Sequence, residues 1–157
     1  MILAAQHIRS RCLEMGLIDP FHERTVCEGF TFGLSSCGYD IRIAEDVKIG
    51  RYGFSLASSI ERFNLPTSLR MTVHDKSSWA RRGLAVQTTI AEPGWRGFLT
   101  LELSNHGFET ILIHAGTPIA QVAFDLLYAP TEQPYEGRYQ DQKAGAQPAI
   151  VAVDGHR

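Results

Sequence analysis

The chain of 157 residues is long enough for one domain with a hydrophobic core and too short for two ordinary domains. Its composition, 44% hydrophobic and 20% charged, is typical of a globular protein and not of a disordered one. A formal net charge of −2 argues against a general binder of nucleic acid, which usually carries a basic excess, although a few local cations can still bind a compact anion.

Membrane, secretion and zinc signals are missing from the sequence. No apolar run approaches the ~20 residues that span a bilayer, and the N-terminal "MILAAQHIRSRC" lacks the pattern of a signal peptide. Three widely spaced cysteines, Cys12, Cys27 and Cys37, suit free thiols in a reducing cytoplasm. The cysteines therefore predict a cytoplasmic protein. Because neither a CxxC pair nor an HExxH or HxE motif occurs, we expect no zinc site.

The best helix candidate is "AAQHIRSRCLEMGLI", in which Ile8, Cys12 and Met15 share one face and Gly16 stands where a glycine commonly ends a helix. Short segments separated by Gly, Pro, Asn and Asp follow, which predicts an all-β sandwich or barrel. The predicted strands lie in residues 38–49, 52–58, 68–74, 83–89, 98–104, 110–114 and 118–127. From Ala129 onward the chain is rich in Pro, Gln, Gly and Tyr, which predicts a tail.

The segment "DKSSWARRG", residues 75–83, interrupts the predicted strands. Its two serines and its final glycine predict a helix of one or two turns with serine N-caps and a glycine stop. Serine hydroxyls, free N–H groups and the flanking Lys76 and Arg81 are the groups that bind phosphate. The alternative is a capped connector whose charges are solvated.

The segment "AEPGWRG", residues 91–97, predicts a Pro-Gly turn that presents Glu92 and Trp95 beside the next strand. That strand, "FLTLELSN", alternates: its leucines point to one face, and Thr100, Glu102 and Ser104 point to the other. Glu102 is therefore either a polar residue on the wet side of a sheet or a carboxylate that a rigid strand holds for chemistry.

The segment "PYEGRYQDQ", residues 134–142, carries polar aromatic residues on a tail with no evident core to join. Such a segment suits a lid that closes over a ligand. The alternative is a disordered chain end.

Taken together, these segments resemble the dCTP deaminases, a family within the trimeric dUTPase-like superfamily. The resemblance covers nearly the whole chain in the family's order and is carried by "SSCGYDIRI", "KSSWARRGL", "EPGWRGFLTLELSN", "AGTPIAQVAF" and "PYEGRYQDQ". It implies one domain over residues 1–157 with a mainly β, dUTPase-like distorted barrel or jelly roll. It also implies a short N-terminal helix region, residues 1–18, and a C-terminal tail, residues 129–157, over the active site.

The resemblance also implies roles for individual residues. Glu102 falls on the catalytic glutamate of the family, and Ser77 and Arg81 help to hold the attacking water. The triphosphate-binding positions of the family match Lys76, Ser77, Ser78 and Arg81, and Glu92 matches the position beside the sugar. Trp79 and Ala80 of the same segment are also implied to bind the nucleotide. The other nucleotide contacts fall on Thr100 and Leu101, through backbone groups at the base, and on Gln121, Tyr135, Arg138 and Gln142.

The implied chemistry needs no metal from protein side chains. Cytidine deaminases of the zinc type use HxE and PCxxC motifs, and neither occurs here. A carboxylate in a partly desolvated pocket can instead carry the proton steps, with Mg²⁺ expected on the substrate phosphates. The sequence departs from the family in Lys76, where arginine is commoner, in Arg138, where lysine is commoner, and in "VQTTIAEPGW", which is about two residues short.

These observations predict hydrolysis of dCTP to dUTP and ammonia by a homotrimer with shared active sites, and no nucleic-acid or membrane partner. Three alternatives remain: a bifunctional enzyme that forms dUMP and pyrophosphate, a pyrophosphatase acting on dUTP or another dNTP, and a nucleotide-binding regulatory homologue. The turn and the glycine-rich tail of a plain dUTPase are not present.

Overall fold

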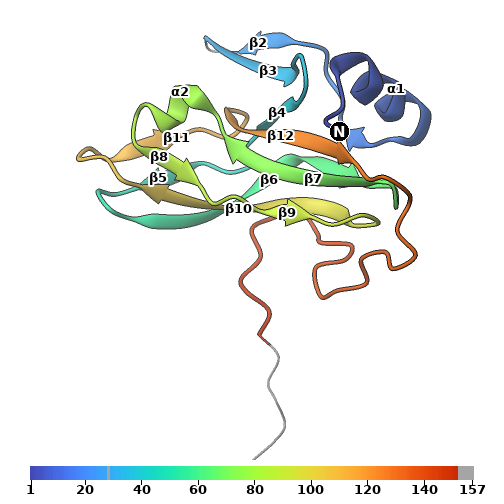
Figure 1. Cartoon of the computed structure of the whole chain (residues 1–157). Coiled ribbons are helices and arrows are strands. Elements are labelled where there is room, and N and C mark those ends of the chain that lie inside the picture. The colour runs from blue at the N-terminus through green and yellow to red at the C-terminus, as the bar shows by residue number, and fades with distance from the viewer. Residues whose placement is uncertain (28, 152–157) are drawn as a thin grey trace, which may run out of the picture.

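The computed structural model describes residues 1–27 and 29–151, and over these residues the chain is mainly β (Figure 1). The helices are α1 (Ala5–Met15) and α2 (Ser77–Ala80). The strands are β1 (Ile18–Asp19), β2 (Thr25–Cys27), β3 (Phe30–Leu34), β4 (Tyr39–Arg42), β5 (Val47–Ile49), β6 (Phe54–Asn64), β7 (Leu69–Asp75), β8 (Leu84–Val86), β9 (Ile90–Ala91), β10 (Arg96–Asn105), β11 (Ile111–Ile113) and β12 (Pro118–Leu126). The predicted mainly β fold is confirmed.

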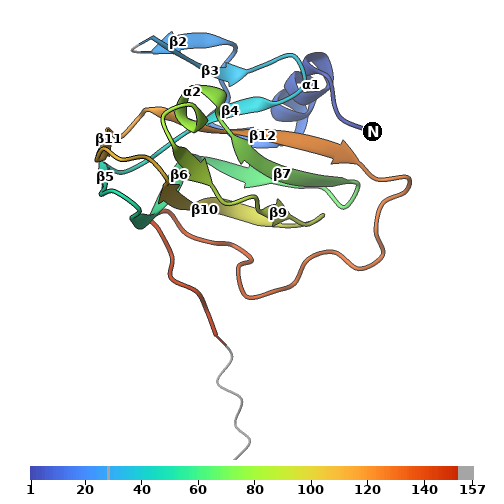
Figure 2. The same ribbon diagram turned by 60° about the vertical axis from the view of Figure 1, so that its left-hand side comes forward.

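Two larger sheets and one strand pair build the body (Figure 2). One sheet has the order β1-β6-β10-β8, the other has the order β2-β3-β4-β12-β7-β9, and β11 pairs with β5. All of the strand pairs are antiparallel, so each strand can bury one face and present the other to solvent. Large side chains from both sheets, among them Tyr39, Phe63 and Phe124, are fully buried in one core.

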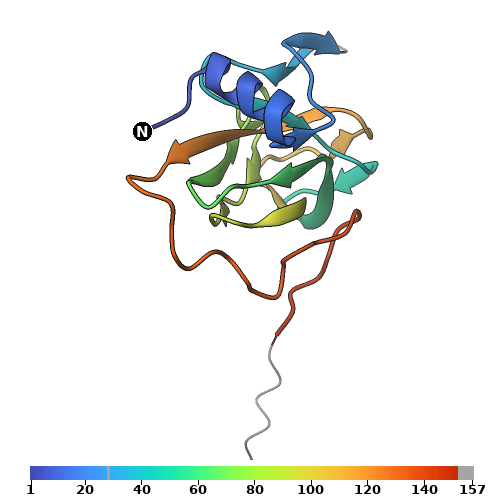
Figure 3. The ribbon, with the colours of Figure 1, turned by 90° about the vertical axis from the view of Figure 1, so that its right-hand side faces the viewer.

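Helix α1 forms as predicted and lies at one side of the body, over the β12 side (Figure 3). Ile8 and Cys12 are buried, and Gly16 ends the helix in the left-handed conformation. Met15, predicted to share a face with Ile8 and Cys12, is 39% exposed at the end of the helix. Gly16 turns the chain immediately after Met15, so the last turn of the helix extends past the core.

The prediction that serines cap helix α2 is wrong. The N-cap is Lys76, its side chain makes no capping hydrogen bond, and Ser77 and Ser78 are the first two residues of the helix. The Trp79 side chain anchors the helix: its indole N–H donates to the Pro118 carbonyl at 2.8 Å, and its ring stacks on Phe30 at 5.4 Å. The predicted glycine stop holds, since Gly83 follows with φ of +87°.

Strand β10 shows the predicted alternation, with Leu99, Leu101 and Leu103 buried. Its pairing with β6 shifts register between Phe98 and Thr100, where the Leu99 N–H donates to the Ser59 hydroxyl at 2.9 Å. Such bulges often lie beside functional sites and fix the direction of the side chains that follow.

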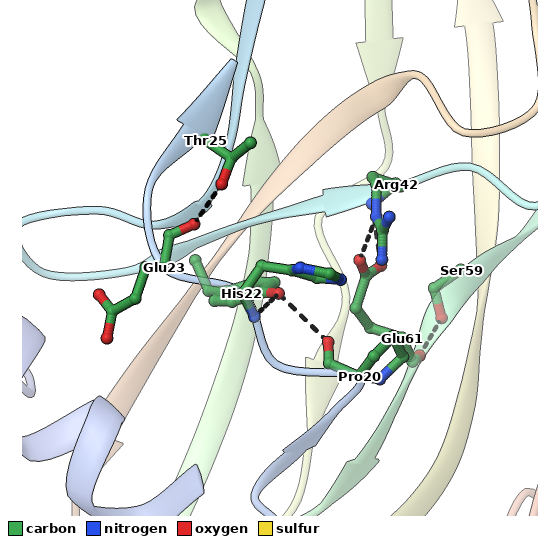
Figure 4. A network of polar contacts seen from close by, with 8 residues as sticks. Pro20, His22, Glu23, Thr25, Arg42, Ser59 and Glu61 are labelled. Carbon is green, nitrogen blue, oxygen red and sulfur yellow. Dashed lines mark hydrogen bonds and ion pairs between the residues drawn. The ribbon is translucent and has the colours of Figure 1, made fainter. Parts of the chain in front are cut away.

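A buried ion pair links β4 to β6 below this bulge (Figure 4). The fully buried Glu61 carboxylate accepts from the Arg42 backbone N–H at 2.9 Å and from its Nε at 2.8 Å. Removing either partner would leave an uncompensated buried charge, so the pair fixes how the two sheets meet.

The tail is docked and not free, which corrects the expectation that it has no core to join. It runs along the side of the body opposite α1 (Figures 1 and 3), and Tyr135 packs against the core. The Trp95 indole N–H donates to the Tyr139 carbonyl at 2.7 Å, and Arg96 forms a two-point ion pair with Asp141. Residues 152–157 of the predicted tail lie outside the described residues.

Candidate functional site

Glu102 lies in a pocket and not on an open face of the sheet. The pocket has a volume of about 410 Å³. It is formed by the polar face of β10, the first residues of β6, the segment before the Pro-Gly turn and the tail. Predicted site residues in its lining are Glu92, Thr100, Glu102, Tyr135 and Gln142. We call this hollow the Glu102 pocket.

The carboxylate of Glu102 is partly buried and has a hydroxyl beside it. Thr89 Oγ1 lies 3.4 Å from Glu102 Oε2, and Glu102 pairs across the sheet with Leu56 of β6. The Gln87 N–H donates to the Glu102 carbonyl at 2.9 Å, which holds the backbone at this position. None of the ion pairs in the described part of the chain includes Glu102, so its carboxylate can act on a bound molecule.

The tail reaches this pocket through Gln142. Its side-chain amide donates to the Phe98 carbonyl and to the Thr100 hydroxyl, both at 2.9 Å. The turn residue Gly94 permits the approach, because a Cβ there would lie 2.8 Å from Cβ of Pro134, and its φ of +86° disfavours other residues. The Trp95 N–H closes this turn on the Glu92 carbonyl at 3.0 Å, as predicted for Pro-Gly.

A second pocket, of about 580 Å³, collects the predicted phosphate-binding residues. Lys76, Ser77, Ser78 and Gln121 line it, and none of its lining residues also lines the Glu102 pocket. We call it the Ser77 pocket. Within one chain, the predicted site residues are therefore divided between two hollows.

The ammonium group of Lys76 is buried and paired inside the Ser77 pocket. Its Nζ donates to Asp40 Oδ2 at 2.7 Å, and both side chains are less than 10% exposed. Gln121 Nε2 donates to the other oxygen of Asp40 at 3.2 Å. Asp40 therefore fixes two predicted nucleotide-binding residues from one carboxylate.

Some predicted site residues lie outside both pockets. The side chains of Trp79 and Leu101 are buried in the core, so a nucleotide could meet only their backbone groups. Arg81 and Ala80 are exposed on helix α2 and the turn after it. Arg138 donates to the Ile150 carbonyl at 3.0 Å within the tail.

The sequence reasoning missed several residues of these pockets. In the Glu102 pocket, the missed residues include Phe54, Leu56, Thr89, Ile90, Tyr139, Gln147, Pro148 and Ala149. In the Ser77 pocket, Arg24, Thr31 and Asp40 are among those missed. Asp40 carried a signal, since it stands in the quoted "SSCGYDIRI", but its burial beside Lys76 depends on residues 36 positions apart.

The described residues contain no group of three or more His, Cys, Asp and Glu side chains arranged to hold a metal ion. In the same part of the chain, no helix has the length and apolar character needed to cross a bilayer.

Comparison with known proteins identifies the family. Residues 44–127 match the dCTP deaminase-like family. The dCTP deaminase of Gemmatimonas aurantiaca is 33% identical over 170 residues, which cover 87% of this chain and 92% of the relative. The dCTP deaminase of Campylobacter fetus subsp. fetus is 32% identical over 177 residues, which cover 92% and 95% of the two chains.

Solved structures show the same fold. The dCTP deaminase of Agrobacterium tumefaciens aligns with a TM-score of 0.66 at 16% identity, over 80% of this chain and 47% of that one. The dUTPase of phage phi11 of S. aureus aligns with a TM-score of 0.57 at 16% identity, over 77% and 93%. Because the family model covers more than half of the chain and relatives about a third identical match most of it, the chain belongs to the dCTP deaminase-like family.

Proposed function

We propose that this protein deaminates dCTP hydrolytically to dUTP and ammonia, with Glu102 as its catalytic residue. The observation that carries the proposal is the position of Glu102 in a pocket between Thr100 and Glu92, with its carboxylate outside any ion pair of the described residues. Relatives that share about a third of the sequence over most of both chains are dCTP deaminases, which supports the choice of substrate.

Glu102 would move the protons of this reaction. It takes a proton from water as the oxygen attacks carbon 4 of the cytosine ring, and it delivers that proton to the ring nitrogen. The remaining hydroxyl proton leaves with the amino group as the carbon–nitrogen bond breaks, so water and dCTP give dUTP and ammonia. Thr89, 3.4 Å from the carboxylate, and strand β10 would hold Glu102 in place for both steps.

The triphosphate would lie at the Ser77 pocket, where Lys76 and the hydroxyls of Ser77 and Ser78 meet. We propose that Mg²⁺ arrives on the phosphates and neutralises part of their charge. The protein's own carboxylates in that pocket are engaged, Asp40 by Lys76 and Asp75 by the Val86 N–H at 2.7 Å. A dUTPase of phage phi11, which has the same fold, coordinates a structural Mg(II) ion.

We further propose that the active form is a homotrimer whose subunits share their sites. This proposal is supported by the way one chain divides the predicted site. The residues predicted to contact the base line one pocket, those predicted to contact the phosphates line another, and Arg81 lines neither. Assembly would bring the Ser77 pocket and Arg81 of one subunit to the Glu102 pocket of its neighbour.

The deciding experiment incubates the purified protein with dCTP, dUTP and dCMP in the presence of Mg²⁺, and identifies the products by chromatography together with ammonia release. Formation of dUTP and ammonia from dCTP supports the proposal. Formation of dUMP and pyrophosphate from dCTP indicates the bifunctional reaction, hydrolysis of dUTP without ammonia release indicates a pyrophosphatase, and binding without any product indicates a regulatory homologue.

A further inference from the structure

Among residues 1–27 and 29–151, three cations and three carboxylates line the Ser77 pocket, and their pairing is uneven. The cations are Arg9, Arg24 and Lys76, and the carboxylates are Glu23, Asp40 and Asp75. Whether the pocket can attract an anion depends on which of these charges are already neutralised by a neighbour.

Two of the cations have carboxylate partners. Arg9 makes a two-point ion pair with Glu23 at 2.5 and 2.8 Å, which lowers the pKa of that carboxyl group. Lys76 is paired with Asp40 at 2.7 Å. Arg24 is exposed, and it takes part in none of the ion pairs or side-chain hydrogen bonds found among residues 1–27 and 29–151. It is thus the pocket cation whose guanidinium remains available to a ligand.

The backbone that carries Arg24 is fixed against the body of the protein. The Leu34 N–H of β3 donates to the His22 carbonyl at 3.1 Å. Within the segment itself, the Thr25 hydroxyl donates to the Glu23 carbonyl at 2.9 Å. Tyr39 contacts the same segment, since its hydroxyl accepts from the His22 N–H at 3.0 Å and donates to the Pro20 carbonyl at 3.3 Å.

Gly33 makes this close approach possible. A Cβ at Gly33 would lie 2.5 Å from the Glu23 carbonyl oxygen and 2.7 Å from that of His22, and its φ is +83°. The segment from residue 20 to residue 25 therefore packs closely against strand β3, and this packing places Arg24 in the lining of the Ser77 pocket.

We propose that Arg24 binds the polyphosphate of the nucleotide and so selects nucleoside triphosphates over monophosphates. A guanidinium group presents a planar fork of donors that matches phosphate oxygens, and here it adds a free positive charge beside Ser77 and Ser78. Arg24 would act as a specificity-determining residue distant from the reacting base. The inference rests on the proposed function, because it takes the Ser77 pocket as the phosphate side of the site.

The test compares Arg24→Gln with the parent by steady-state kinetics and by titration calorimetry with dCTP and with dCMP. Loss of a charge-assisted contact should weaken dCTP binding about 10- to 100-fold and raise KM by a similar factor, with the change in KM rather than in kcat. Binding of dCMP should be unchanged. Arg24→Lys keeps the charge but loses the planar fork of donors, so its affinity for dCTP should lie between those of the parent and of Arg24→Gln.

Arg11→Gln is the matched control, because Arg11 is a half-buried arginine of α1 that lines neither pocket and whose side chain donates only to the His7 carbonyl. Equal losses for dCTP and dCMP, an unchanged KM for Arg24→Gln, or the same loss in Arg11→Gln would overturn the role of Arg24. A parent protein that neither binds dCTP nor releases ammonia from it would overturn the proposed function, and this inference with it. Far-UV circular dichroism of each variant separates a binding defect from unfolding.

Discussion

At the scale of single residues, the main question is what Glu102 does. Its position on the polar face of a strand fits both a solvated residue and a catalytic carboxylate, and only the surrounding side chains distinguish these two roles. Thr89, Glu92 and Tyr135 come from three other segments and enclose it in one pocket. A carboxylate that is enclosed and free of an ion pair is suited to general acid–base chemistry.

Glu102→Gln tests this role, because glutamine keeps the size of the side chain but cannot take a proton from water. Deamination should fall by about 10²–10⁴-fold, the usual contribution of general acid–base catalysis. Binding of dCTP should largely remain, since the phosphate contacts are untouched. Ammonia release, calorimetry with dCTP and thermal unfolding measure the three quantities.

Glu109→Gln serves as the control for that variant, because Glu109 is an exposed glutamate of the following loop. An ordinary surface substitution changes stability by less than about 0.5 kcal/mol, and activity should not change. Unimpaired ammonia release from Glu102→Gln would mean that Glu102 is only a polar strand residue.

The cysteines allow a second test at this scale. Cys12 lies on the buried face of helix α1, and that burial raises the pKa of its thiol to about 11, whereas Cys27 and Cys37 are exposed. At pH 8 the Cys12 thiol therefore stays protonated in the folded state and should react with a disulfide reagent only after denaturation. We expect two thiols to react rapidly in the native protein and three in denaturant. Rapid modification of Cys12 in the native protein, located by mass spectrometry, would contradict this packing.

At the scale of elements, strand β10 and the tail form one unit around the Glu102 pocket. Trp95, just before β10, and Arg96, its first residue, hold the tail, and later residues of the strand carry Thr100 and Glu102 into the pocket. Gln142 joins both parts, because its amide donates to Phe98 and Thr100. The tail thus forms one wall of the pocket.

Removing residues 134–157 should abolish most of the activity and leave unfolding cooperative, because the strands of the core all precede the cut. The melting temperature should fall, since Trp95 loses the Tyr139 carbonyl that its indole N–H now contacts. Ammonia release and calorimetric unfolding measure the two effects.

A shorter deletion, of residues 152–157, is the control because it keeps every tail contact described here. Full activity in the longer deletion would show that the tail does not contribute to the site. A loss of the cooperative transition would show that the tail is part of the core and not an addition to it.

At the scale of the whole molecule, the proposed homotrimer with sites between subunits would unite the two pockets that lie apart within one chain. Light scattering should give a mass three times the 17.5 kDa of one chain. The sharper test co-expresses Glu102→Gln with Arg81→Ala. Each variant should be nearly inactive alone, whereas mixed trimers contain some sites with both native residues and should recover part of the activity. Recovery that fails although mixed trimers form, or a monomeric mass, would contradict shared sites.

The sequence by itself determined the features that depend on neighbouring residues. Alternation in "FLTLELSN" predicted which face of β10 carries Glu102, Pro-Gly predicted the turn before it, and Gly16 predicted the end of the first helix; all three are confirmed. Such patterns are local, because side-chain direction and turn geometry repeat over two to four residues.

Only the tertiary structure decided the features that depend on distant residues. It paired Lys76 with Asp40, replaced the expected serine caps, exposed Met15 and docked the tail on Trp95 and Arg96. It also divided the predicted site between two pockets. These outcomes follow from which surfaces meet when the sheets close over one core, and a buried charge or a docked segment is stable only when its distant partner is in place.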